Sequence, residues 1–170
     1  KLAPVATELL GYYMDGDNSK HGITNIEYTE HGLRVVEFGE TSVLNKVLRN
    51  DKPINMRFIK DTLSYAGKSP IITSADSYYF YTSGVDLALG LGSATAITSI
   101  KFEEGKILAK ITVTDHYDFG KKEANAGDFL KSAYILQQSG RKKTFAYKTT
   151  YDVTYTIDEF LDYILKGIGD

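Results

Sequence analysis

Two carboxylates, an imidazole and a phenol lie close together in the segment ITVTDHYDFGKK, residues 111–122. Asp115 and Asp118 are three residues apart, and Tyr117 stands between them. Carboxylate oxygens are the ligands that Mg²⁺ and Ca²⁺ prefer. A metal held there would offset the charge of a phosphate during hydrolysis. Tyr117 could donate a hydrogen bond to that phosphate, and His116 could act as an acid or base near neutral pH.

The same residues also have a purely structural interpretation. In a regular strand, alternation would point His116 away from Asp115 and Tyr117. Asp115 and Asp118 would then cap a turn, and Tyr117 would pack against the core. Because short motifs often match by chance, the spacing alone favours this structural interpretation.

The clearest strand pattern in the chain leads into this segment. Two alternating runs flank EEGK, residues 103–106, which predicts a hairpin with Gly105 in its turn. Before it, residues 71–92 predict a strand, a turn and a second apolar segment. After it, we expect a helix capped near Asp128 and stopped by Gly140, then a long strand over residues 142–157. A closing helix follows, with Asp158 as its cap.

The first third of the chain is dominated by helical patterns. A helix starts at Pro4, residues 23–38 predict a hairpin broken at His31-Gly32, and residues 39–50 predict a helix capped by Thr41 or Ser42. Residues 51–67 fit either a strand or a short helix. The fold class is therefore α+β, an antiparallel sheet with flanking helices in one domain over residues 1–170. Residues 1–66 form its mainly helical part, and residues 67–170 its β-rich part.

Composition limits the class of protein. The 170 residues carry a net charge of −2, which leaves no electrostatic footprint for nucleic acid. There is no cysteine, so disulfides and thiol chemistry are excluded. No apolar run reaches the roughly 20 residues of a membrane span. No signal peptide is visible, so we expect a mature protein or a domain of a longer one.

Three further segments invite a functional interpretation. DGDNSKHG, residues 15–22, lacks the glycine and glutamate positions of a calcium loop and predicts a polar turn. GLGS, residues 90–93, lacks the lysine of a phosphate loop and predicts close packing or a turn. The basic cluster at residues 141–148 is either a solvated strand start or an attractor for pyrophosphate or anionic lipid headgroups.

The segment DHYDF, residues 115–119, resembles the D-x-Y-D-F motif of the colicin M family, bacteriocins that act on the peptidoglycan precursor lipid II. PVATELLGYYMDGDN, residues 4–18, is similar to the helix that opens the activity domain of that family. ALGLGSATAITS, residues 88–99, is similar to its small-residue turn into a strand. Most of the chain can be laid on the activity domain, but only the short motif is specific.

The resemblance implies an α+β fold around a half-open β-barrel. It implies hydrolysis of the bond between undecaprenyl and pyrophosphate in lipid II, with Mg²⁺ or Ca²⁺ as cofactor. The protein would be secreted and would act at the periplasmic face of the cytoplasmic membrane of a target bacterium, with a cognate immunity protein as a second partner. Asp115, Tyr117 and Asp118 would be catalytic, and Asp115 and Asp118 would hold the metal.

One departure from the family stands just after the motif. Members of the family have a His-Arg pair there, and this chain has Ala124 and Asn125 in its place. Neither can shuttle a proton or grip phosphate as arginine does. Two alternatives therefore stay open: a non-catalytic module on the same fold that binds a lipid, carbohydrate or protein, and a structural β-rich domain. The residues that could support the site are His116, Lys121, Lys122, Asn125 and Arg141.

Overall fold

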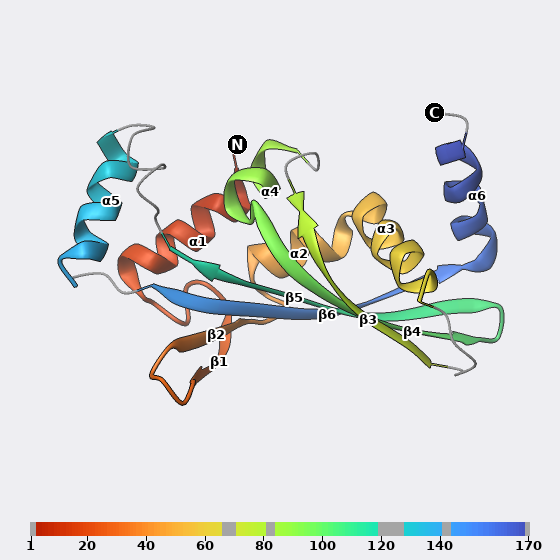
Figure 1. Cartoon of the computed structure of the whole chain (residues 1–170), viewed down its shortest axis with the longest axis horizontal. Coiled ribbons are helices and arrows are strands. Elements are labelled where there is room, and N and C mark those ends of the chain that lie inside the picture. Colours follow the sequence, from red (N-terminus) through yellow and green to blue (C-terminus); the bar gives the residue numbers. More distant parts are fainter. Residues whose placement is uncertain (1–2, 66–70, 81–83, 119–127, 141–143, 169–170) are drawn as a thin grey trace.

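The computed structural model describes residues 3–65, 71–80, 84–118, 128–140 and 144–168. In these ranges helices and strands alternate irregularly along the chain (Figure 1). The elements are α1 (Pro4–Asp15), β1 (Ile23–Tyr28), β2 (Arg34–Phe38), α2 (Val43–Asn50), α3 (Lys52–Leu63), β3 (Ile71–Tyr79), α4 (Val85–Gly90), β4 (Ser93–Glu103), β5 (Lys106–Tyr117), α5 (Asp128–Gln138), β6 (Phe145–Thr156) and α6 (Ile157–Ile168).

The strands form one sheet in the order β1-β2-β6-β5-β4-β3, which confirms the α+β class. The sheet is open, since β1 and β3 are its edges and do not pair with each other. Four of its neighbouring pairs are antiparallel, but β2 and β6 run parallel. The sheet is therefore mixed and not wholly antiparallel as expected. A parallel pair needs a long crossover, and the chain between β2 and β6 provides one.

Residues 3–65 form α1 and α2 as the helical pattern predicted, and also α3, whose segment fitted either a strand or a helix. They also supply β1 and β2, and β2 pairs with β6 through Val35 and Ala146. The helical and β-rich parts of the chain thus share one sheet. Among the helices of the described ranges, none has both the length and the apolar character needed to cross a membrane.

The hairpin between β4 and β5 forms where it was predicted. Glu104 and Gly105 both have positive φ angles, 50° and 73°, the backbone of a tight hairpin turn. Along β5 the side chains alternate, and Ile107, Ala109, Ile111 and Val113 are buried. Figure 1 shows α1, α2, α3 and α4 gathered over one face of the sheet, so the core lies between these helices and that face.

The starts of two helices could not be settled from the sequence and are defined by the structure. The ambiguous segment after residue 50 is the helix α3, because the Asp51 carboxylate accepts the N–H of Ile54 and Pro53 fits the first turn. The last helix begins at Ile157, one residue before Asp158. Its cap is Thr156, not Asp158: the Thr156 hydroxyl accepts the N–H of Glu159 at 3.1 Å.

Two helices are capped by carboxylates from other helices: a side chain of α1 caps the start of α2, and a side chain of α4 caps the start of α1. The buried carboxylate of Glu8, on α1, accepts the N–H groups of Val43 and Leu44 at the start of α2, at 2.9 and 2.7 Å. Asp86, on α4, accepts the N–H groups of Val5 and Ala6 at 3.0 and 3.1 Å. Helix N-termini carry unpaired N–H groups and a partial positive charge, so these carboxylates fix α1 against both α2 and α4.

Replacing Glu8 by alanine removes the acceptor of both N–H groups. We expect Glu8→Ala to lower the free energy of unfolding by about 2–4 kcal/mol, measured by urea unfolding followed by circular dichroism. The matched control is Glu30→Ala, because Glu30 is exposed between β1 and β2. That change should stay within about 0.5 kcal/mol. Equal stability of the two variants would contradict the capping role.

Candidate functional site

The end of β5 places the motif residues on opposite faces of the sheet. Asp115 and Tyr117 continue the face that carries Ile111 and Val113, and both are partly buried. His116 is exposed on the other face, so the predicted alternation is confirmed. Thr114 is paired with Thr95 of β4, whereas Asp115 pairs with Tyr147 of β6. Asp115 therefore lies where the covered face reaches the end of the sheet.

Burial changes the acidity of Asp115. Desolvation raises its pKa from the usual 3.8 to about 6, and the nearby charge of Asp118 acts in the same direction. The backbone N–H of His116 donates to its Oδ1 at 2.8 Å and limits the rise, as does the charge of the His116 ring. Asp115 thus changes protonation near neutral pH, which is the property required of a general acid or base.

Tyr147 is the buried neighbour of this carboxyl group. It faces Asp115 across the β5–β6 pair and is 1% exposed. Its hydroxyl lies close enough to lower the pKa of Asp115 slightly. It makes no hydrogen bond of good geometry within the described residues. Burial raises the pKa of Tyr147 well above its ordinary value, so the phenol stays protonated. A buried O–H donor therefore lies beside Asp115.

Tyr117 is part of an aromatic cluster with Phe145, Tyr12 and Tyr13. Its ring stacks on Phe145 with 5.3 Å between centroids and is tilted against Tyr13 at 5.8 Å. Tyr12 meets Phe145 edge-on at 5.1 Å. Burial raises the pKa of Tyr117 well above its ordinary value, so its phenol is a donor at neutral pH.

The remaining predicted site residues separate into two groups. Asp118 is exposed just after β5, and its charge reaches Asp115 as described above. His116 is exposed on the opposite face of the strand from the other motif residues. The others lie outside the described residues: Lys121, Lys122, Asn125 and Arg141.

Asp115 and Asp118 offer the oxygen donors that a hard cation requires. Within the described ranges, however, no group of three or more His, Asp or Glu residues is arranged to hold a metal ion. The two carboxylates could hold one side of a cation and leave the rest of its ligands to water or phosphate. The Mg²⁺ or Ca²⁺ site at Asp115 and Asp118 stays a prediction.

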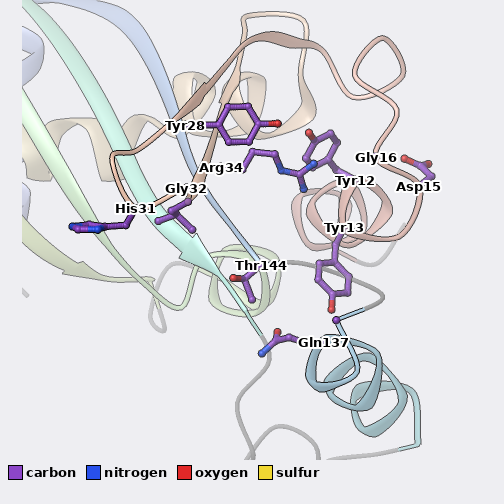
Figure 2. Close-up of a pocket in the computed structure, with 12 residues that line it drawn as sticks. Tyr12, Tyr13, Asp15, Gly16, Tyr28, His31, Gly32, Arg34, Gln137 and Thr144 are labelled. Carbon is purple, nitrogen blue, oxygen red and sulfur yellow. The ribbon is translucent and has the colours of Figure 1, made fainter.

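A cavity of about 850 Å³ opens beside this strand end (Figure 2). It lies between the end of α1, the turn from β1 to β2, the end of α5 and the residue before β6. Tyr13 belongs both to its wall and to the aromatic cluster, so the cavity and the motif strand share a boundary. Its lining residues are Tyr12, Tyr13, Asp15, Gly16, Tyr28, His31, Gly32, Leu33, Arg34, Gln137, Gly140 and Thr144.

The sequence offered only a faint signal for this cavity. The chain has 13 tyrosines and no tryptophan, a composition that favours strand surface rather than a pocket. Arg34 carries no motif at all. These residues come together only because α1, the first hairpin and α5 converge at one end of the sheet.

Two other predicted segments have the structural roles expected of them. In the polar turn after α1, Asp17 accepts the N–H and hydroxyl of Ser19, and Asp15 pairs with His21 at 2.9 Å. In the GLGS segment, Gly90 is in close contact with α1. A Cβ atom there would lie 2.9 Å from Cγ1 of Val5, so close packing is confirmed.

No protein-family profile matches the chain, and no curated protein sequence matches it. Among solved structures, it is similar to truncated syringacin M, a bacteriocin from Pseudomonas syringae pv. tomato DC3000. The TM-score is 0.31 and the sequence identity 13%. The match covers 61% of this chain and 48% of that one, so it spans about half of the bacteriocin structure. This is a weak structural likeness to one bacteriocin.

The raised pKa of Asp115 makes stability depend on pH. Between about pH 4 and 6 the unfolded carboxyl group has lost its proton while the folded one retains it. The unfolded state therefore binds fewer protons, and stability falls as pH rises through this window. We expect the free energy of unfolding of the wild type, relative to Asp115→Asn, to fall from pH 4 to 6 and then level off. The burial effect would be contradicted if the free energies of unfolding of the wild type and Asp115→Asn changed in parallel with pH. A carbon-13 NMR titration of Asp115 with its midpoint near 4 would also contradict it.

Proposed function

We propose that this chain is an antibacterial toxin domain that hydrolyses the undecaprenyl–pyrophosphate linkage of lipid II, as its resemblance to the colicin M family implies. The observation that carries the proposal is Asp115, a carboxyl group with a pKa of about 6 at the end of the covered sheet face. Asp118 and Tyr117 accompany it in the D-x-Y-D-F motif. The domain would act after secretion, at the outer face of the cytoplasmic membrane, and an immunity protein would protect its producer.

In this hydrolysis, water attacks the phosphorus atom next to the isoprenyl chain. A new P–O bond forms, the bond from phosphorus to the undecaprenyl oxygen breaks, and the proton of the water ends on the released undecaprenol. Asp115 in its ionised form can take this proton, then return it to the leaving oxygen. The protonated phenol of Tyr117 can donate a hydrogen bond to a phosphate oxygen. A divalent cation, when bound, would neutralise part of the negative charge of the pyrophosphate.

A second candidate function is binding without turnover. The cavity beside the strand end favours it, because this cavity is large and its lining combines tyrosines and polar side chains with the charged groups of Asp15 and Arg34. The replacement of the family's His-Arg pair by Ala124 and Asn125 points in the same direction. Tight binding of lipid II with no release of undecaprenol would select this alternative, and rapid turnover would exclude it.

The hydrolysis is tested by incubating the protein with lipid II and either Mg²⁺ or Ca²⁺ and measuring the released undecaprenol. We expect Asp115→Asn to slow release by about 10²–10⁴-fold, as for loss of a general base. The matched control is Asp76→Asn, because Asp76 on β3 accepts the next N–H at 2.8 Å just as Asp115 does, but is exposed. No release with either metal, or equal rates for Asp115→Asn and the wild type, would exclude hydrolysis.

The role of Asp118 is tested in cells. We expect Asp118→Ala to abolish killing when the domain is exported to the periplasm of a sensitive bacterium, because the metal would lose one of its two carboxylates. In vitro, a chelator should stop the wild-type reaction, and added Mg²⁺ or Ca²⁺ should restore it. Because Asp118 is exposed, its replacement should leave the unfolding curve unchanged. Unchanged killing by a normally exported Asp118→Ala domain would contradict this role.

A further inference from the structure

Arg34 in the cavity is held between aromatic rings, with no ion pair to any described residue. Its guanidinium carbon lies 5.4 Å from the centre of the Tyr12 ring and 5.5 Å from that of Phe145. It is partly buried, and among the described residues no carboxylate lies within ion-pair distance of it. Arg57, by contrast, lies 5.3 Å from the centre of the Tyr78 ring and also pairs with Asp61 at 4.0 Å.

Contact with aromatic rings orients a guanidinium group without using its hydrogen-bond donors. The rings interact with the positive charge, while the five N–H groups point outward in the plane. This planar set of donors matches the spacing of oxygens in phosphate. Arg34 therefore presents to the cavity an oriented cation that no described carboxylate neutralises.

The other charges around the cavity do not compete for Arg34. The Asp15 carboxylate accepts hydrogen bonds from the N–H of Asp17, from Nζ of Lys20 and from Nε2 of His21. Figure 2 shows Asp15 at the far edge of the cavity and the His31 ring turned away from Arg34. The positive charge of Arg34 is thus the feature that an entering anion would meet.

The remaining wall suits a hydroxyl-rich body. Tyr28, opposite Arg34 in the β1–β2 pair, is 70% exposed at the cavity and offers both a ring face and a hydroxyl. Thr144 and Gln137 line the part of the cavity away from Arg34 (Figure 2). A volume of about 850 Å³ holds far more than a bare phosphate ion and lies in the usual range of ligand sites, roughly 300–1,000 Å³.

We infer that this cavity binds a phosphate group attached to a hydroxyl-rich, sugar-sized body, with the phosphate on Arg34. The inference goes beyond the proposed hydrolysis, since it rests on the cavity and not on Asp115. The ligand can be a soluble sugar phosphate or a phosphorylated lipid headgroup, because both present the same chemistry to Arg34.

The test is calorimetric titration of the whole chain at constant ionic strength with glucose 1-phosphate, inorganic phosphate and glucose. We expect saturable binding of glucose 1-phosphate, weaker binding of phosphate and none of glucose. Arg34→Gln should weaken binding at least tenfold, and Arg34→Lys less than Arg34→Gln. Arg57→Gln, the matched ring-stacked arginine, should bind like the wild type. The lipid source is probed with phosphatidylcholine vesicles with and without phosphatidylinositol 4-phosphate.

Binding of either phosphate-bearing probe that is lost in Arg34→Gln supports the inference, and the probe that binds identifies the source. The inference is overturned if neither probe binds, if glucose binds as well as its phosphate, or if Arg34→Gln binds normally. Circular dichroism checks the fold of each variant, and Tyr28→Ser, at an exposed position, gives an independent second loss of several-fold. Asp115→Asn should retain binding, so failure of hydrolysis and failure of this site are distinguishable.

Discussion

The arrangement of the helices over the sheet depends on one buried carboxylate, that of Glu8. It accepts the first N–H groups of α2 from a position within α1, so the start of α2 is hydrogen-bonded to the side of α1. Burial raises the pKa of Glu8 even though these N–H donors lower it, so desolvation is the stronger effect at this contact. Asp86 holds the start of α1 in the same way. Because α1 is fixed at both contacts, Tyr12 and Tyr13, one turn further along, have defined positions at the end of the sheet.

Those two tyrosines connect the parts of the candidate site. Tyr13 packs against Tyr117 of the motif strand, while Tyr12 packs against Phe145 and beneath Arg34. The same aromatic cluster therefore covers the end of β5, where Asp115 is partly desolvated, and forms a wall of the cavity. A partly buried carboxyl with a raised pKa and an arginine with no ion pair to any described residue are both unfavourable for a purely structural core. Their presence on two sides of one aromatic cluster is the reason for treating this end of the sheet as functional.

Much of the fold could be predicted because its signals are local. The β4–β5 hairpin follows from alternation around Gly105, and α2 follows from an apolar stripe capped by Ser42. The sequence fell short where an unrecognised cap or a distant contact decides the structure. Residues 51–65 show no clear period, and α3 forms because Asp51 caps it. The β2–β6 pair is parallel because a crossover brings together strands more than one hundred residues apart. The Thr156 cap was missed because it overlaps the last residue of a strand, where alternation is the stronger signal.

The alternating pattern is enough to tell which residues of the motif share a face, since side chains of a strand alternate with a period of two. It also determined that Asp115, Tyr117 and Asp118 follow a strong hairpin. No sequence pattern shows that the face of Asp115 is the covered one, that Tyr147 lies opposite it, or that Arg34 lines a cavity nearby; these features follow from the packing of the folded chain. The physical reason is that desolvation and charge pairing depend on neighbours from α1, β2 and β6, which are distant in the chain and have no local pattern that would bring them together.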